Sequence, residues 1–179
     1  MLIVDHYLDA ACRIDSPNCD DRPEAEDISL IVVHCISLPP EQFEGDYIDD
    51  LFCNRLDPAA HPYFQEIYQL KVSAHVLIRR DGSVRQYVPF NRRAWHAGAS
   101  EYLGRPRCND FSVGIELEGA VAMVYTDSQY HRLAEIIKLL LANYPALSKE
   151  AIIGHSDIAP GRKTDPGPTF DWQRLRALL

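Results

Sequence analysis

Short apolar runs rich in β-branched residues recur along this chain, and residues that favour turns separate them. The stretches LIVVH (30–34) and AIIGH (151–155) are typical of buried strands, while VGIEL (113–117) alternates between apolar and other residues. The stretch TDSQYHRLAEIIKLLLANYP (126–145) opens with a capping box and carries an apolar stripe at helical spacing. Because strands and helices interleave, the sequence predicts an α/β fold in which helices flank a central mixed β-sheet.

Length and composition indicate one domain. The chain has 179 residues, of which 46% are hydrophobic and 25% charged, as in ordinary globular proteins. We therefore expect residues 1–179 to form a single domain, with the polar segment 1–28 as an irregular N-terminal wrap. A strand pair joined at Asp81-Gly82 is predicted within residues 73–90, and Asp171 is expected to begin a terminal helix.

Charge, hydropathy and cysteine spacing argue against several function classes. The formal net charge of -8 argues against phosphate-driven binding of nucleic acid. No apolar run is long enough to span a membrane, and the N-terminus lacks the basic and apolar regions of an export signal. The five cysteines have no CxxC spacing and fit reduced thiols. We expect a monomeric cytoplasmic protein that binds neither nucleic acid nor a membrane.

Two of the predicted strands end on a histidine. His34 closes one run and His155 closes another, and Asp165 follows beyond a loop that prolines and glycines stiffen. Two imidazoles and one carboxylate can form a three-ligand zinc set that leaves a fourth position for water. Spacing alone does not separate this trio from ordinary surface or core residues, because the chain has no HExxH motif and no Cys/His ladder.

Seven stretches, taken together, resemble one known family. They are VVHCIS, VSAHVLIRRDGSVRQYVPF, RAWHAG, CNDFSVGIELEG, YTDSQY, IIGHSDIAPGRKTDPGP and FDW, in this order between Ser29 and Trp172. The chain is similar in these stretches to the type-2, zinc-dependent N-acetylmuramoyl-L-alanine amidases, which share their fold with peptidoglycan recognition proteins. Within that group it resembles the AmpD-type 1,6-anhydro-N-acetylmuramyl-L-alanine amidases.

The resemblance implies a role for each of five residues. It assigns one Zn²⁺ per chain to His34, His155 and Asp165. It also implies that Glu116 moves a proton from water to the leaving amine and that Lys163 stabilises the developing oxyanion. The residue pattern agrees, because Glu116 lies opposite the apolar face of its predicted strand and Lys163 stands two residues before Asp165.

The implied reaction is hydrolysis of the amide bond between the lactyl group of 1,6-anhydro-N-acetylmuramic acid and L-alanine. The substrates would be anhydro-muropeptides, which links the resemblance to cell-wall recycling and to the control of β-lactamase induction. Trp95, His96 and Arg107 are the candidate substrate contacts, since the first two match a stretch that lines the family's cleft and the arginine could pair with a carboxylate. A core tryptophan and a free surface arginine are the ordinary alternatives.

Other interpretations stay open at this stage. Glu118 shares a face with Glu116, although a strand turned partly to solvent would place a glutamate in the same way. His75 could support the metal site or could simply be packed and hydrogen-bonded. A recognition module that binds muropeptides without cleaving them would not need the five hydrolytic residues. A periplasmic amidase acting on intact peptidoglycan would need an export signal.

Overall fold

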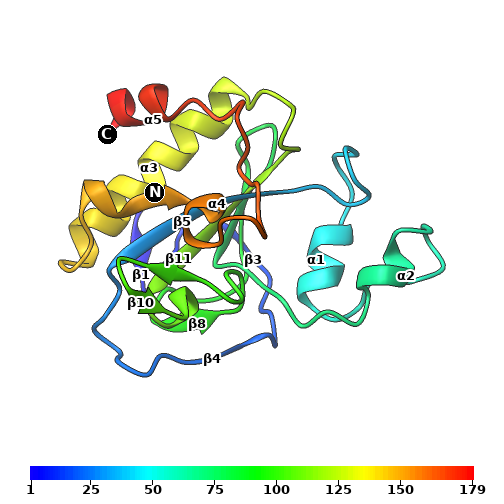
Figure 1. Cartoon of the computed structure of the whole chain (residues 1–179), viewed down its shortest axis with the longest axis horizontal. Helices are drawn as coiled ribbons and strands as arrows, with labels where there is room; N and C mark the ends of the chain where they lie inside the picture. Colours follow the sequence, from blue (N-terminus) through cyan, green and yellow to red (C-terminus); the bar gives the residue numbers. More distant parts are fainter.

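A six-stranded mixed sheet forms the centre of the structure, a computed structural model that describes residues 1–179 (Figure 1). The strand order is β12-β5-β11-β6-β7-β3. The parallel strands are β12 (Ile152–Gly154), β5 (Leu30–Ile36), β11 (Ser112–Glu118) and β6 (Val76–Ile78). The hairpin strand β7 (Val84–Gln86) is antiparallel to β6, and the edge strand β3 (Cys12–Arg13) is parallel to β7. The predicted mixed sheet and the hairpin are confirmed.

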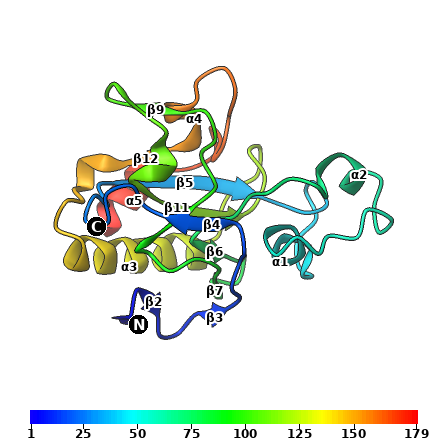
Figure 2. The same ribbon diagram turned by 90° about the horizontal axis from the view of Figure 1, so that it is seen from below.

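Smaller elements surround this sheet. The two-stranded sheets pair β1 (Ile3–Val4) with β2 (Tyr7–Leu8), β4 (Cys19–Asp21) with β8 (Arg92–Ala94), and β9 (Glu101–Tyr102) with β10 (Arg105–Pro106). The helices are α1 (Tyr47–Phe52), α2 (Phe64–Ile67), α3 (Asp127–Asn143), α4 (His155–Ile158) and α5 (Trp172–Leu178), with 3₁₀ turns η1 (Cys108–Asp110) and η2 (Lys149–Ala151). Figure 2 shows α3 beneath one face of the sheet, α4 and β9 above the other, and α1 and α2 beyond the end of β5.

The long helix α3 covers one face of the sheet and begins as predicted. The hydroxyl of Thr126 accepts the backbone N–H of Gln129, while the Gln129 side chain accepts the backbone N–H of Thr126. This reciprocal capping satisfies two donors at the helix start. The apolar stripe of α3 packs with the inward side chains of β5 and β11 into the largest hydrophobic cluster of the molecule. None of the helices is long and apolar enough to cross a bilayer.

The two faces of β5 have different partners, and this alternation places the site. Ile31 and Val33 belong to the largest cluster, between α3 and the sheet, whereas Leu30 and Val32 belong to a smaller cluster on the opposite face. Side chains alternate along a strand, so His34 lies on the face away from α3. Glu116 is the register partner of His34 on β11. The two side chains therefore stand next to each other near the carboxyl ends of parallel strands, where ligand sites of open α/β sheets are commonly found.

The N-terminal segment 1–28 contains more regular structure than the expected irregular wrap. Its strand β3 extends the main sheet, and β4 pairs with β8. Side chains of the domain fix it in place: Gln86 accepts the backbone N–H of Leu8 and donates to the carbonyl of His6. The buried Arg22 donates to backbone carbonyls on the η1 and β11 side, including that of Ser112. Strands of only two or three residues are too short to give a periodic sequence signal.

Candidate metal and active site

Three potential metal ligands meet at the carboxyl ends of β5 and β12. His34 lies within β5, two residues before its end, and His155 is the first residue of α4, directly after β12. Asp165 reaches them from the Pro/Gly-rich loop, whose carbonyl at that residue accepts the Ser156 N–H. The His34 and His155 Nδ1 atoms are 3.0 Å apart, and Asp165 Oδ2 lies 3.2 Å and 3.0 Å from them. The two histidine side chains are buried, and the Asp165 side chain is 13% exposed.

The chemistry of these three groups fits a cation. The Nε2 of His155 lies 3.2 Å from the carbonyl oxygen of Ala97, which can only accept, so in the neutral ring, the form that binds a metal, the hydrogen is on Nε2 and Nδ1 carries a lone pair. That lone pair faces a carboxylate oxygen at 3.0 Å, a repulsive contact unless a positive charge lies between them. Burial lowers the pKa of His34 to about 4, so its ring is neutral at pH 7. Tetrahedral zinc with bonds of about 2.0–2.1 Å holds its ligand atoms about 3.3 Å apart, close to the spacing here.

The Asp165 carboxylate is suited to stay ionised. Burial by itself would raise the pKa of Asp165, but a hydrogen bond from an imidazole that carries its hydrogen on Nδ1 lowers it below its usual range, and a cation in the same place would act in the same direction. A deprotonated carboxylate and a neutral imidazole are the forms that bind a metal.

Glu116 presents a buried carboxylate beside this trio. Its side chain is 8% exposed, and its Oε2 has no hydrogen-bond partner. Burial, reinforced by the charge of Asp165, raises the pKa of Glu116 well above its ordinary value, while Lys163 acts in the opposite direction. A carboxylate that is costly to keep charged binds protons readily, which is the property of a general base in hydrolysis.

All five residues implied by the resemblance line one cavity of about 390 Å³. Lys163 lies on the exposed loop between α4 and Asp165, at the cavity wall. Another part of the wall is apolar and comes from the region of α1 and α2, including Leu51, Phe52 and Ile67. Sequence reasoning assigned no role to this wall, although the helical spacing of apolar residues around α1 indicates a buried face.

The candidate substrate contacts divide into two groups. Trp95 and His96 both line the cavity, and the Trp95 indole donates to Asp20. Arg107 lies outside it: the side chain is 72% exposed and forms an ion pair with Asp110 at 2.6 Å. The structure therefore brings Trp95 and His96 to the metal site but not Arg107.

Two residues with open interpretations now have clear surroundings. Glu118 is 2% exposed and pairs with Arg79 at 3.3 Å, which contradicts the alternative that its strand turns partly to solvent. His75 is fully buried, accepts the Gly114 N–H at Nδ1 and contacts the carbonyl of Arg92 through Nε2. It packs near His96 without touching a metal ligand.

Among the five free cysteines, Cys35 lines the cavity, and burial raises the pKa of its thiol to about 12.

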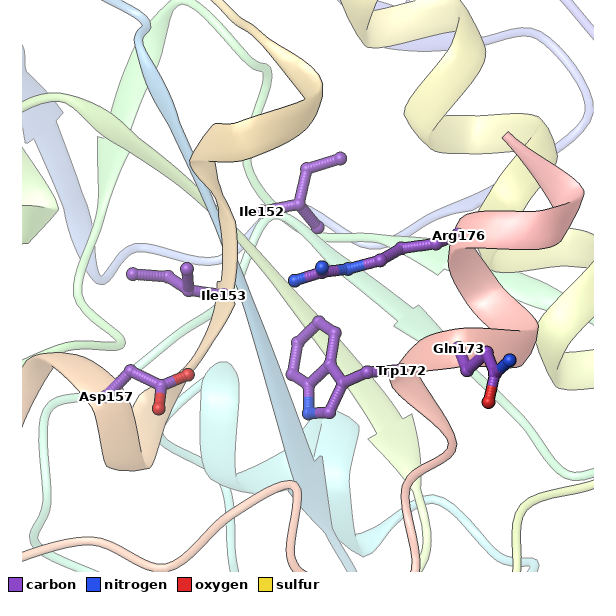
Figure 3. Close-up of a pocket in the computed structure, with 6 residues that line it drawn as sticks. All are labelled: Ile152, Ile153, Asp157, Trp172, Gln173 and Arg176. Carbon is purple, nitrogen blue, oxygen red and sulfur yellow. The ribbon is translucent and has the colours of Figure 1, made fainter.

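A second hollow of about 460 Å³ lies along the outer edge of β12. Figure 3 shows the Arg176 side chain beside the ring of Trp172, both from α5, facing Ile152 and Ile153. Asp157 supplies the one carboxylate there, and none of the three metal-ligand candidates lines this hollow. All five residues that the resemblance implies line the other cavity, at the strand ends.

Comparison with known proteins identifies the family of this chain. Residues 24–168 match the N-acetylmuramoyl-L-alanine amidase family. The chain is 58% identical to 1,6-anhydro-N-acetylmuramyl-L-alanine amidase AmpD of Citrobacter freundii, over 100% of this chain and 95% of that protein. A crystal structure of a selenomethionine derivative of AmpD matches with a TM-score of 0.97 and 57% identity, covering 100% of this chain and 99% of that one.

A solved complex of a more distant relative contains a bound substrate. It is the amidase AmiD of Escherichia coli with anhydro-N-acetylmuramic acid-L-Ala-D-gamma-Glu-L-Lys. That structure matches with a TM-score of 0.63 and 28% identity, over 85% of this chain and 57% of that one. The resemblance seen in the sequence is confirmed, and the chain belongs to the N-acetylmuramoyl-L-alanine amidase family, with its AmpD-type members among its relatives.

Proposed function

We propose that this protein is a zinc amidase that cleaves the bond between the lactyl group of 1,6-anhydro-N-acetylmuramic acid and L-alanine. The observation that carries the proposal is the meeting of His34, His155 and Asp165 in one cavity with Glu116 and Lys163. Full-length similarity to AmpD amidases supports the anhydro-muropeptide as substrate, as does the anhydro-muramyl peptide bound by AmiD.

Each residue has a task that follows from its position. His34, His155 and Asp165 would hold one zinc ion, which supplies an acidified water and polarises a carbonyl when bound. Glu116, next to His34 on the neighbouring strand, would take a proton from the attacking water and pass it to the leaving amine. Lys163 at the cavity wall would balance the negative charge that develops on the carbonyl oxygen.

The cavity walls would select the substrate. Trp95 and His96 would contact the bicyclic sugar, and the apolar wall near α1 and α2 would exclude water from the reacting bond. Arg107 lies beyond this cavity, so it would contact only a part of the substrate that extends outside it. We infer from this shape a higher kcat/KM on anhydro-muropeptides than on muropeptides with a free reducing end.

The same function sets the cellular context. We propose a monomer that works in the cytoplasm on imported wall fragments, in cell-wall recycling, and that thereby influences β-lactamase induction. Intact peptidoglycan lies outside the cytoplasmic membrane, so a cytoplasmic enzyme meets only fragments. Fractionation of the native protein into the periplasm would favour a wall amidase instead.

Purified protein incubated with an anhydro-muropeptide tests the reaction. Mass spectrometry should show the free stem peptide and the anhydro-sugar, and a chelator should stop the reaction until zinc is restored. Binding of the muropeptide without any cleavage by the zinc-loaded protein would support a recognition module. Equal rates on anhydro and reducing-end substrates would contradict the proposed selectivity.

A further inference from the structure

The outer ring nitrogens of both histidine ligands contact the same dipeptide. The Nε2 of His34 lies 2.9 Å from Nδ1 of His96, and the Nε2 of His155 lies 3.2 Å from the carbonyl oxygen of Ala97. We infer that the dipeptide His96-Ala97, held by the Asn109 side chain, orients both histidines, and that Asn109 is a positioning residue of the metal site. This inference rests on the zinc site proposed above.

The hydrogen bonds around the dipeptide have a fixed direction. With Nδ1 of His34 facing the other two ligands, the ring hydrogen is on Nε2 and is donated to Nδ1 of His96. His96 then carries its own hydrogen on Nε2, which lies 3.2 Å from the hydroxyl oxygen of Ser112. Partners on the outer nitrogen select the tautomer of a ligating histidine and fix the orientation of its ring.

Asn109 holds the dipeptide by a single atom. Its Oδ1 accepts the backbone N–H of His96 at 3.1 Å and that of Ala97 at 2.8 Å. Asn109 belongs to η1, just before β11, so it ties the dipeptide to the strand that carries Glu116. Arg162 adds a bond of 2.6 Å to the Ala97 carbonyl, next to the contact from His155. One amide oxygen thus positions both acceptors, Nδ1 of His96 and the Ala97 carbonyl, that orient the two histidine ligands.

Packing gives His96 one position. An added Cβ on Gly114 would overlap Cγ of the His96 ring, so the ring rests directly on the glycine of β11. The ring also meets His34 edge-on, with centroids 4.9 Å apart. His96 therefore has a structural reason to stay between Gly114 and His34 whether or not it touches the substrate.

Zinc affinity of Asn109 variants tests the inference directly. Asn109→Leu removes the acceptor at similar volume, whereas Asn109→Asp keeps an oxygen for both N–H groups. Competition with a chromophoric zinc chelator should show about 10–100-fold weaker binding for Asn109→Leu, the range typical of lost outer partners, and near wild-type binding for Asn109→Asp. The control is Gln86→Leu, which removes buried hydrogen bonds on β7 that do not reach the site. It should lower the Tm and leave zinc affinity unchanged.

A matched pair of variants at His96 tests the contact between Nε2 of His34 and Nδ1 of His96. In His96→Asn the side-chain oxygen can occupy the place of Nδ1 and accept from His34, whereas His96→Leu cannot accept. We expect weaker zinc binding in the second variant only, and less than additive losses when it is combined with Asn109→Leu, because both changes disturb one unit.

The outcomes separate this inference from the proposed function. A wild-type chain that binds no zinc would overturn both. Tight zinc binding by wild type together with equal affinity of Asn109→Leu, or weakening by Gln86→Leu as large as by Asn109→Leu, would overturn the positioning role alone.

Discussion

Burial of the Glu116 carboxylate would prepare this side chain for the proton transfer that we propose. Its unpartnered oxygen and raised pKa would be a destabilising defect in an ordinary strand. We expect Glu116→Gln to lower kcat by about 10²–10⁴-fold, the usual contribution of a positioned base, and Lys163→Met by about 10²–10³-fold through loss of charge stabilisation. Both variants should keep zinc, as measured by elemental analysis. Near wild-type kcat in either one would remove that residue from the mechanism.

His75 should make the stability of the protein sensitive to acid. Burial, with the nearby Arg22 guanidinium, lowers the pKa of His75 to about 3, below the value of about 6.5 expected in the unfolded chain. The unfolded state therefore binds the proton first, and this group's contribution to stability is present above pH 6.5 and is lost as the pH falls toward 3. Urea unfolding of chelated protein at pH 7 and pH 4.5 should show a smaller loss in His75→Gln than in wild type. Identical losses would show that His75 does not contribute.

The sequence predicts those site residues that are marked by their residue type and by their position in a motif. His34, His155, Asp165, Glu116 and Lys163 were assigned by motif, and the structure brings them to one cavity. The bonds of Asn109 to two backbone N–H groups were not predictable, because an asparagine in a loop looks the same whether it binds backbone or water.

At the scale of elements, β11 depends on a glycine in its middle. Gly114 faces His96, while its neighbour Val113 belongs to the largest cluster, between the sheet and α3. We expect Gly114→Ala to displace the His96 ring and weaken zinc binding, because the new Cβ would overlap it. Val113→Ala is the control: it should lower the free energy of unfolding by leaving a cavity, without changing zinc affinity. Equal zinc affinity in both variants would argue that the ring can shift at no cost to the site.

Elements with strong periodicity were predictable and short ones were not. The helix α3, the strand β11 and the hairpin β6-β7 follow from capping, alternation and the Asp-Gly turn. The pairing of β3 with β7 depends on backbone contacts between distant segments, and a strand of only two residues has no sequence pattern that predicts them.

For the whole molecule, zinc would join segments far apart in the chain. His34 lies 121 positions from His155 and 131 from Asp165, so a bound ion would hold together a site that the unfolded chain lacks. Zinc at a thousandfold excess over its Kd would add about 4 kcal/mol to stability, or roughly 8–16 °C in Tm for a domain of this size. Calorimetry with and without chelator measures this shift. In Asp165→Ala the shift should vanish, and full zinc occupancy in that variant would contradict the ligand set.

The positions of the two tryptophans have an optical consequence. Trp95 lines the cavity with the metal ligands, whereas Trp172 lies in the separate hollow beside β12. A Trp172→Phe variant therefore retains one indole. Its emission should change when a muropeptide enters the cavity and should not respond to changes around the hollow beside β12. With Glu116→Gln added to stop turnover, a fluorescence titration would give the substrate Kd without cleavage. An emission spectrum unchanged by saturating anhydro-muropeptide would place the bound sugar away from Trp95.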